Sequence, residues 1–98
     1  MSVDHEYKYE IITTSRFKKD LHRAIKRNLD MSELDVVVTK LAKGEVLDEK
    51  YHNHNLSGKY AGYQDCHIGP DWVLVYKIAE TELLLVLYRT GTHSDLFE

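Results

Sequence analysis

The side chains best suited to chemistry in this sequence are histidines placed where strands are expected to end. His67 stands just before a Gly-Pro-Asp turn, His93 closely follows the last apolar run, and His54 lies in a polar arm. Imidazole titrates at about pH 6.5, so a pair of histidines can hold one base and one acid at neutral pH. Cleavage of a phosphodiester by its neighbouring 2′-hydroxyl requires such a pair. These positions therefore predict an acid–base site if the strand ends converge.

Other side chains near these histidines could assist the same chemistry or could be purely structural. Arg89 could neutralise charge that develops on a phosphate without a metal. Phe97 could stack on a base, or it could pack on the domain as a plug. Asp71 follows a proline and could serve only the turn, and Trp72 could belong to the core. A lone histidine at a strand end can likewise be a hydrogen-bonded structural residue, so both roles stay open.

A zinc site is an alternative use of the same histidines. His52, His54, His67 and His93 could together supply nitrogen ligands. The signal is weak, because the sequence has no His-x-x-x-His pair and its only cysteine is Cys66. We therefore expect no metal and no other cofactor.

The composition is that of an ordinary globular protein, with 43% hydrophobic and 30% charged residues. At 98 residues, a single domain is expected over 1–98. No apolar run approaches the roughly 20 residues that cross a bilayer, and residues 1–10 are polar. We therefore expect a cytoplasmic protein with no membrane partner, and a single cysteine, which cannot form an internal disulfide, agrees with that location.

Basic residues are concentrated in one segment, although the net charge is −3. The negative net charge argues against strong attraction to free nucleic acid, because that attraction depends on phosphate neutralisation by Lys and Arg. Residues 16–27 are nevertheless rich in cations and could form one basic face. The candidates for an RNA-facing role are Lys18, Lys19, Arg23, Lys26 and Arg27. A solvated helix face is the alternative.

The first half of the sequence predicts a strand followed by a helix hairpin. Residues 7–13 are β-branched and aromatic, which is typical of a strand. Apolar residues at helical spacing predict a first helix from Ser15 to near Asn28. A capping-box pattern at 30–33 and further helical spacing predict a second helix over 31–43.

The second half predicts a polar arm over 45–59 and three strands. The strands are expected at 63–68, 72–78 and 83–90. Their short connections favour antiparallel neighbours. The order strand, helix, helix, strand, strand, strand predicts an α+β fold, in which an antiparallel sheet carries the helix hairpin on one face.

Two blocks of the sequence resemble the signature blocks of the YafQ-type toxins, which belong to the RelE/ParE toxin superfamily. These blocks are residues 67–77 (His-Ile-Gly-Pro-Asp-Trp-Val-Leu-Val-Tyr-Lys) and 89–97 (Arg-Thr-Gly-Thr-His-Ser-Asp-Leu-Phe). Residues 17–21, 30–34, 54–58 and 62–63 are also similar in order and spacing, so the likeness covers about 7–97. The resemblance implies a RelE-like fold.

The resemblance also implies a ribosome-dependent endoribonuclease of a type II toxin–antitoxin pair, which cuts mRNA in the ribosomal A site. A cognate antitoxin would bind it in a hetero-oligomeric complex, and operator DNA would be bound only through that antitoxin. The basic segment would then dock on ribosomal RNA. The competing interpretation is a catalytically silent module that binds an antitoxin and acts in operator regulation.

Carried over by position, the family's active-site residues fall on His54, His67, Asp71, His93 and Phe97, with Trp72 and Arg89 as nearby support. His52 is not part of the family pattern. Gln64 departs from it, because relatives often carry Arg there, and one possible phosphate contact is thereby absent. We expect His54 to act as the base and His93 as the acid for the leaving 5′-oxygen. The remaining polar groups, His67, Asp71 and Arg89, are expected to orient the phosphate.

Overall fold

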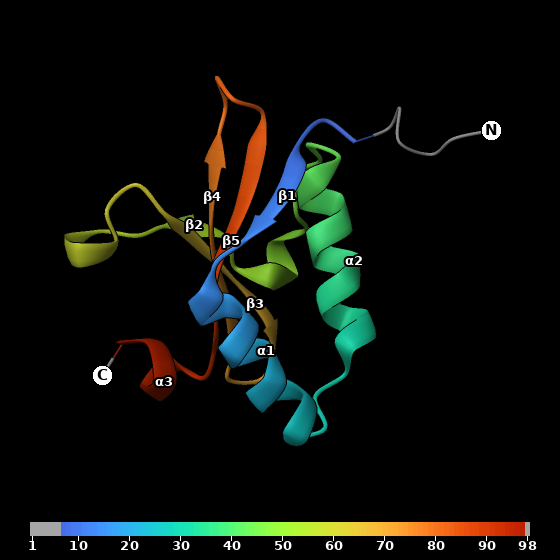
Figure 1. The fold of residues 1–98 in the computed structure, drawn as a ribbon, viewed down its shortest axis with the longest axis vertical. Coiled ribbons are helices and arrows are strands. Elements are labelled where there is room, and N and C mark those ends of the chain that lie inside the picture. Colours follow the sequence, from blue (N-terminus) through green and yellow to red (C-terminus); the bar gives the residue numbers. More distant parts are fainter. Residues whose placement is uncertain (1–6, 98) are drawn as a thin grey trace.

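A five-stranded sheet forms the centre of the structure, a computed structural model that describes residues 7–97 (Figure 1). The strands are β1 (Glu10–Thr13), β2 (His54–Asn55), β3 (Gln64–Gly69), β4 (Trp72–Ala79) and β5 (Leu84–Gly91). The helices are α1 (Ser15–Lys26), α2 (Met31–Ala42) and α3 (His93–Phe97), with short 3-10 segments η2 (Glu49–Tyr51) and η3 (Gly58–Tyr60). The polar start of the sequence, residues 1–6, lies outside the described residues.

The sheet has the strand order β1-β5-β4-β3-β2 and confirms the α+β class. β2, β3, β4 and β5 pair antiparallel with their neighbours, whereas β1 pairs parallel with β5, with Glu10 opposite Leu84. The prediction of a wholly antiparallel sheet is therefore wrong at this edge. The chain passes through both helices, the arm and two hairpins between β1 and β5, and a long connection of this kind permits parallel pairing.

Two capped helices cover one face of the sheet and run in opposite directions, as predicted (Figure 1). The Thr14 side chain caps α1 by accepting a 3.0 Å hydrogen bond from the Phe17 N–H. Asp30 caps α2 as expected, by accepting from the Ser32 N–H at 3.0 Å. Gly44 ends this element with a φ of +81°, which glycine adopts without a Cβ clash.

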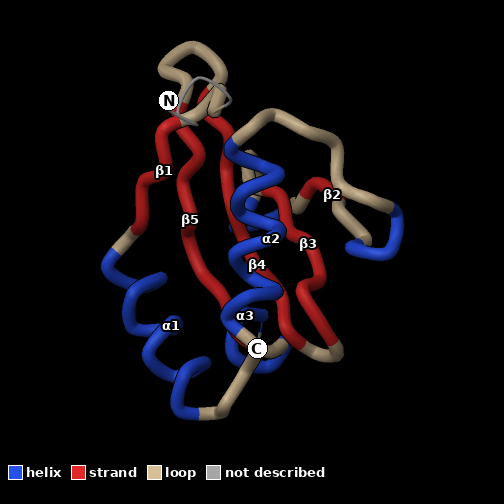
Figure 2. The backbone as a smooth tube through the Cα atoms, turned by 90° about the vertical axis from the view of Figure 1, so that its right-hand side faces the viewer, coloured by secondary structure: helices blue, strands red, loops and turns tan. Residues whose placement is uncertain are grey.

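The apolar stripes of both helices bury the main core against the sheet. Phe17 of α1 and Val37 and Leu41 of α2 pack in one cluster with strand residues that include Leu74 and Tyr76. α2 lies along the sheet in front of β4 and β3 in the view of Figure 2. This packing fixes β3 and β4, whose shared turn carries part of the site.

A second, smaller cluster contains strand side chains that alternate with those of the main core. Val73 and Val75 of β4 pack here against Leu96 of α3, with Tyr60 and Tyr63 from the arm beside them. The sequence pattern indicated neither α3 nor the two-residue β2. Both elements are short and depend on tertiary contacts, and both carry histidines of the site. No helix within residues 7–97 is long and apolar enough to cross a bilayer.

Candidate active site

Four imidazoles gather where β2, the end of β3 and the start of α3 meet. The His67 ring is central, because its centroid lies 5.2 Å from that of His93, 5.5 Å from that of His52 and 6.4 Å from that of His54. The β3–β4 turn and the β5–α3 junction thus bring together histidines 26 positions apart in sequence. The predicted convergence of the strand ends is confirmed.

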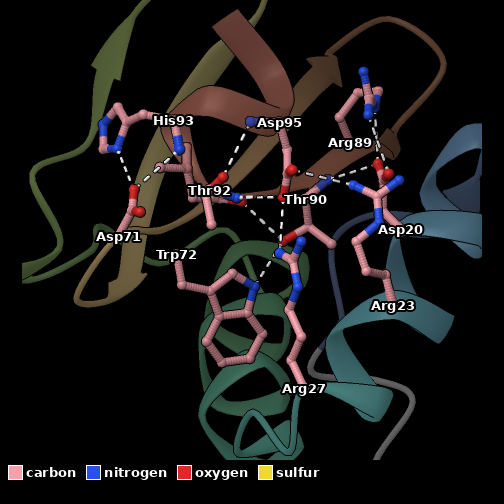
Figure 3. A network of polar contacts seen from close by, with 11 residues as sticks. Asp20, Arg23, Arg27, Asp71, Trp72, Arg89, Thr90, Thr92, His93 and Asp95 are labelled. Carbon is pink, nitrogen blue, oxygen red and sulfur yellow. Dashed lines mark hydrogen bonds and ion pairs between the residues drawn. The ribbon is translucent and has the colours of Figure 1, made fainter. Parts of the chain in front are cut away.

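Asp71 holds His93 in a fixed orientation. Its Oδ1 accepts the His93 backbone N–H at 3.0 Å and lies 2.9 Å from His93 Nδ1 (Figure 3). The hydrogen bond from that backbone N–H lowers the pKa of Asp71, so the carboxylate is ionised and can only accept. The His93 proton therefore lies on Nδ1 in this contact, and Nε2 faces away from Asp71, free for a substrate.

Asp65 lies beside the His54 ring, and the sequence did not indicate this contact. The two residues are direct partners across β2 and β3, and His54 Nδ1 lies 2.8 Å from Asp65 Oδ1. The contact is close but not aligned as a hydrogen bond, and this Oδ1 has no hydrogen-bond partner among the described residues. The signal available in the sequence was an acid two positions before His67, which places both on one face of a strand.

Burial shifts the pKa values of Asp65 and His67 in opposite directions. Asp65 is 3% exposed, and the loss of solvent raises its pKa, while the nearby histidines oppose that rise. Burial also lowers the pKa of His67, against the attraction of Asp65. His67 is therefore neutral at pH 7. It lies between His54, which contacts the buried carboxylate of Asp65, and His93, which contacts the exposed carboxylate of Asp71.

Asn53 anchors the arm that carries two of the four histidines. Its side-chain amide donates to the Asp65 carbonyl oxygen at 2.9 Å and to the Tyr76 hydroxyl at 2.6 Å. The anchor lies between His52 and His54 in sequence, so a single side chain positions both rings relative to β3. Asn53 is a second positioning residue that the sequence pattern did not indicate.

Two residues expected to bind substrate are instead held inside the fold (Figure 3). The Arg89 guanidinium donates to the Asp20 carboxylate from Nε at 2.8 Å and from Nη2 at 3.1 Å, and only 10% of its side chain is exposed. Trp72 is 4% exposed and donates from Nε1 to the Thr90 hydroxyl at 2.9 Å. Arg89 thus ties β5 to α1, and Trp72 has the core role that the sequence left open for it. A contact of Arg89 with the phosphate stays a prediction.

Asp95 joins α3 to the basic helix. Its carboxylate lies 2.9 Å from Arg27 Nη1 and 3.3 Å from Arg23 Nη1, and it accepts the Thr92 N–H at 3.0 Å. The Arg27 hydrogen bond is the main reason that the pKa of Asp95 falls to about 2. Two of the five predicted RNA-facing cations are thus paired within the fold, although both remain about half exposed.

The other predicted residues lie where a substrate could reach them. Lys18, Lys19 and Lys26 are exposed on α1. Phe97 is half-buried, with its ring centroid 6.0 Å from that of His93 and 5.5 Å from that of Tyr60. An aromatic ring beside the proposed acid is suitably placed to stack on a base.

Nearly all of the chain matches a known toxin family. A family model described as the bacterial toxin of a type II toxin–antitoxin system, YafQ, matches residues 9–98. The chain belongs to the YafQ toxin family. The mRNA interferase toxin YafQ of Escherichia coli K12 is 40% identical over 89 residues, which cover 90% of this chain and 95% of that protein.

Solved structures agree with the YafQ assignment and with the RelE-like fold that the resemblance implied. The crystal structure of the E. coli DinJ–YafQ toxin–antitoxin complex matches with a TM-score of 0.84 at 38% identity, covering 93% of this chain and 99% of that chain. A metal-bound toxin from Helicobacter pylori matches with a TM-score of 0.86 at 40% identity, covering 91% of this chain and 99% of that chain.

Two details of this YafQ-family site bear on the open alternatives. Gln64 accepts a 3.2 Å hydrogen bond from the Tyr76 hydroxyl, so its side chain supports the sheet. Within residues 7–97, no three or more His, Cys, Asp or Glu side chains are arranged to hold a metal ion.

Proposed function

We propose that this protein is a ribosome-dependent endoribonuclease that cuts mRNA in the ribosomal A site and thereby inhibits translation. The observation that carries the proposal is a central imidazole with lowered pKa flanked by two imidazoles, each of which contacts a carboxylate through Nδ1. This arrangement provides separate proton acceptors and donors within one cluster. The mRNA interferase activity in the name of the E. coli relative points to the same chemistry.

The mechanism that we propose is metal-free transfer within the RNA backbone. His54 takes the proton of the ribose 2′-hydroxyl, and the 2′-oxygen attacks the adjacent phosphorus. The bond from phosphorus to the 5′-oxygen breaks, and His93 gives its proton to that leaving oxygen. The products are a 2′,3′-cyclic phosphate and a 5′-hydroxyl. His67 orients the phosphate between them, and Asp65 and Asp71 orient the two reacting imidazoles.

The ribosome would hold the mRNA in place, which this small acidic protein cannot do well by itself. A net charge of −3 gives little hold on free RNA, whereas the exposed lysines of α1 can contact ribosomal RNA. Holding the mRNA in one geometry can lower a reaction barrier by up to about 7 to 11 kcal/mol. Because ribosomes and mRNA are in the cytoplasm, we expect this protein to act there, as a single domain. A cognate antitoxin would neutralise it and provide its only link to operator DNA, by analogy with the E. coli complex.

The test compares cleavage of one mRNA on programmed ribosomes and free in solution. The purified protein is first treated exhaustively with a chelator, and ribosomal magnesium is then kept in place during the reaction. We expect cleavage only on ribosomes, with cyclic phosphate ends. Equal cleavage of free mRNA contradicts ribosome dependence, loss of activity that zinc restores contradicts the metal-free mechanism, and no cleavage at all favours the silent module.

A further inference from the structure

A pocket of about 390 Å³ adjoins the histidine cluster and has no role in the mechanism above. Its walls come from the start of α2, from η2 and from the β3–β4 turn, and include Glu33, Lys50, Tyr51 and His52. His67 lines the pocket and is also the centre of the cluster. A strand of RNA with a phosphate at His67 can therefore place an adjacent nucleotide at the mouth of this pocket.

The wall of the pocket combines apolar and hydrogen-bonding groups. Pro70 is exposed there beside the mostly buried Tyr51 and Ile68, and Lys50 Nζ lies 5.2 Å from the Tyr51 ring centroid. Such surfaces suit the face of a nucleobase, because unpaired RNA bases are bound by packing on side chains and by hydrogen bonds at their edges. The size also falls within the range of small-molecule sites, about 300 to 1,000 Å³.

The carboxylates in the pocket wall favour a base over a second phosphate as the occupant. Two carboxylates, Glu33 and Asp71, line the pocket beside Lys50 and His52. Carboxylates repel phosphate oxygens, and they accept hydrogen bonds from the exocyclic amino groups of bases. Asp71 already accepts from His93 through Oδ1 and orients that ring in the proposed mechanism, whereas Glu33 has no role there, so Glu33 is the acceptor that we assign to a base.

The backbone around the pocket is held in uncommon conformations. His52 has a φ of 49° and Asp71 a φ of 50°, and they are two of the four non-glycine residues with positive φ in the described chain. The pairing of β3 with β4 also shifts register between His67 and Gly69. Strained positions of this kind tend to gather at ligand sites, where the surrounding structure maintains them.

We propose that this pocket is a nucleobase subsite, in which Glu33 accepts a hydrogen bond from the exocyclic amino group of a base next to the cleaved phosphate. The subsite rests on the proposed endoribonuclease function, since the base belongs to the mRNA being cut. It gives the enzyme a preference for amino-bearing bases at one position.

The experiment measures single-turnover cleavage of ribosome-bound mRNAs that carry adenine or unsubstituted purine, which lacks only the amino group, at each nucleotide flanking the cut. For one of the two positions, the parent is expected to cut the adenine substrate on the order of tenfold faster, the effect of one hydrogen bond to a charged group. Glu33→Ala is expected to cut both substrates at similar rates, and Glu33→Gln, which keeps an acceptor oxygen, to discriminate partially.

Glu45→Ala is the matched control, because Glu45 is an exposed glutamate that does not line the pocket. This variant should discriminate like the parent. Equal rates on adenine and purine at both positions in the parent, or discrimination that survives in Glu33→Ala, overturn the subsite while leaving the endoribonuclease intact. Absence of cleavage of every substrate by the parent overturns the proposed function and the subsite with it.

Discussion

Replacing Asp65 with Asn tests whether the buried carboxylate positions the proposed base. Asparagine keeps the size of the side chain and removes its charge, so the fold of β3 should be retained. Once His54 has taken the proton from the 2′-hydroxyl, its unit charge and that of Asp65 attract, at the 2.8 Å contact, by about 1.5 kcal/mol in water and about 6 kcal/mol at an effective dielectric constant of 20. Because 60% of the His54 side chain is exposed, the lower value applies.

Since about 1.4 kcal/mol corresponds to a factor of ten, losing an attraction of about 1.5 kcal/mol in Asp65→Asn is expected to slow cleavage on programmed ribosomes about tenfold. The free energy of unfolding, in contrast, should not fall. Since burial raises the pKa of Asp65, its folded form binds protons more readily than the unfolded chain, and its contribution to stability falls as pH rises above the ordinary value of 3.8. At pH 8 the variant should therefore be at least as stable as the parent.

The assay combines single-turnover cleavage over a range of pH with urea unfolding at pH 8. Asp48→Asn is the control, since Asp48 is exposed and its side chain makes no capping hydrogen bond. A positioning role predicts slower cleavage and an altered pH profile without loss of stability, and only in Asp65→Asn. Cleavage as fast as that of the parent, with the same pH profile, would refute the reasoning.

Three further outcomes follow from the geometry. Replacing Lys18, Lys19 and Lys26 with Gln should weaken co-sedimentation with ribosomes and lower the slope of its logarithmic salt dependence by about 2 to 3; unchanged binding would leave α1 as a solvated face. Asp95→Asn should lower the free energy of unfolding at pH 7, because an α1 arginine holds the pKa of Asp95 at about 2, and this difference from the parent should shrink as pH falls from about 4 to 2. Trp72→Phe removes a buried hydrogen bond to β5 and should cost about 1 kcal/mol in urea unfolding, while ribosome binding persists.

The parts of the fold that local signals encode were predictable from the sequence. α2 begins at the residue after Asp30 and ends just before Gly44, because a cap and a glycine mark both ends locally. The parallel pairing of β1 was not predictable, since side-chain periodicity is the same for both strand directions. α3 and β2 have five and two residues, too few for any period to show.

In the candidate site, too, some residues were predictable from local signals and others were not. His67, Asp71 and His93 could be placed together because turn and strand-end signals lie beside each of them. Asp65 could not be assigned to His54, because the register of β2 on β3 decides that pairing. Arg89 was assigned to substrate for the opposite reason: its partner Asp20 is 69 positions away, and nothing in the local sequence indicates that contact.

The most direct test of the account is whether His93 protonates the leaving 5′-oxygen. His93→Ala keeps the backbone N–H that Asp71 accepts, so the turn should persist. On ordinary ribosome-bound mRNA this variant should cut on the order of 10² to 10⁴ times more slowly than the parent, the usual contribution of one general acid. On an mRNA with sulfur in place of that 5′-oxygen, a leaving group that needs no proton, the variant should cut nearly as fast as the parent. Equal slowing on both substrates would contradict the assignment of His93 as the acid.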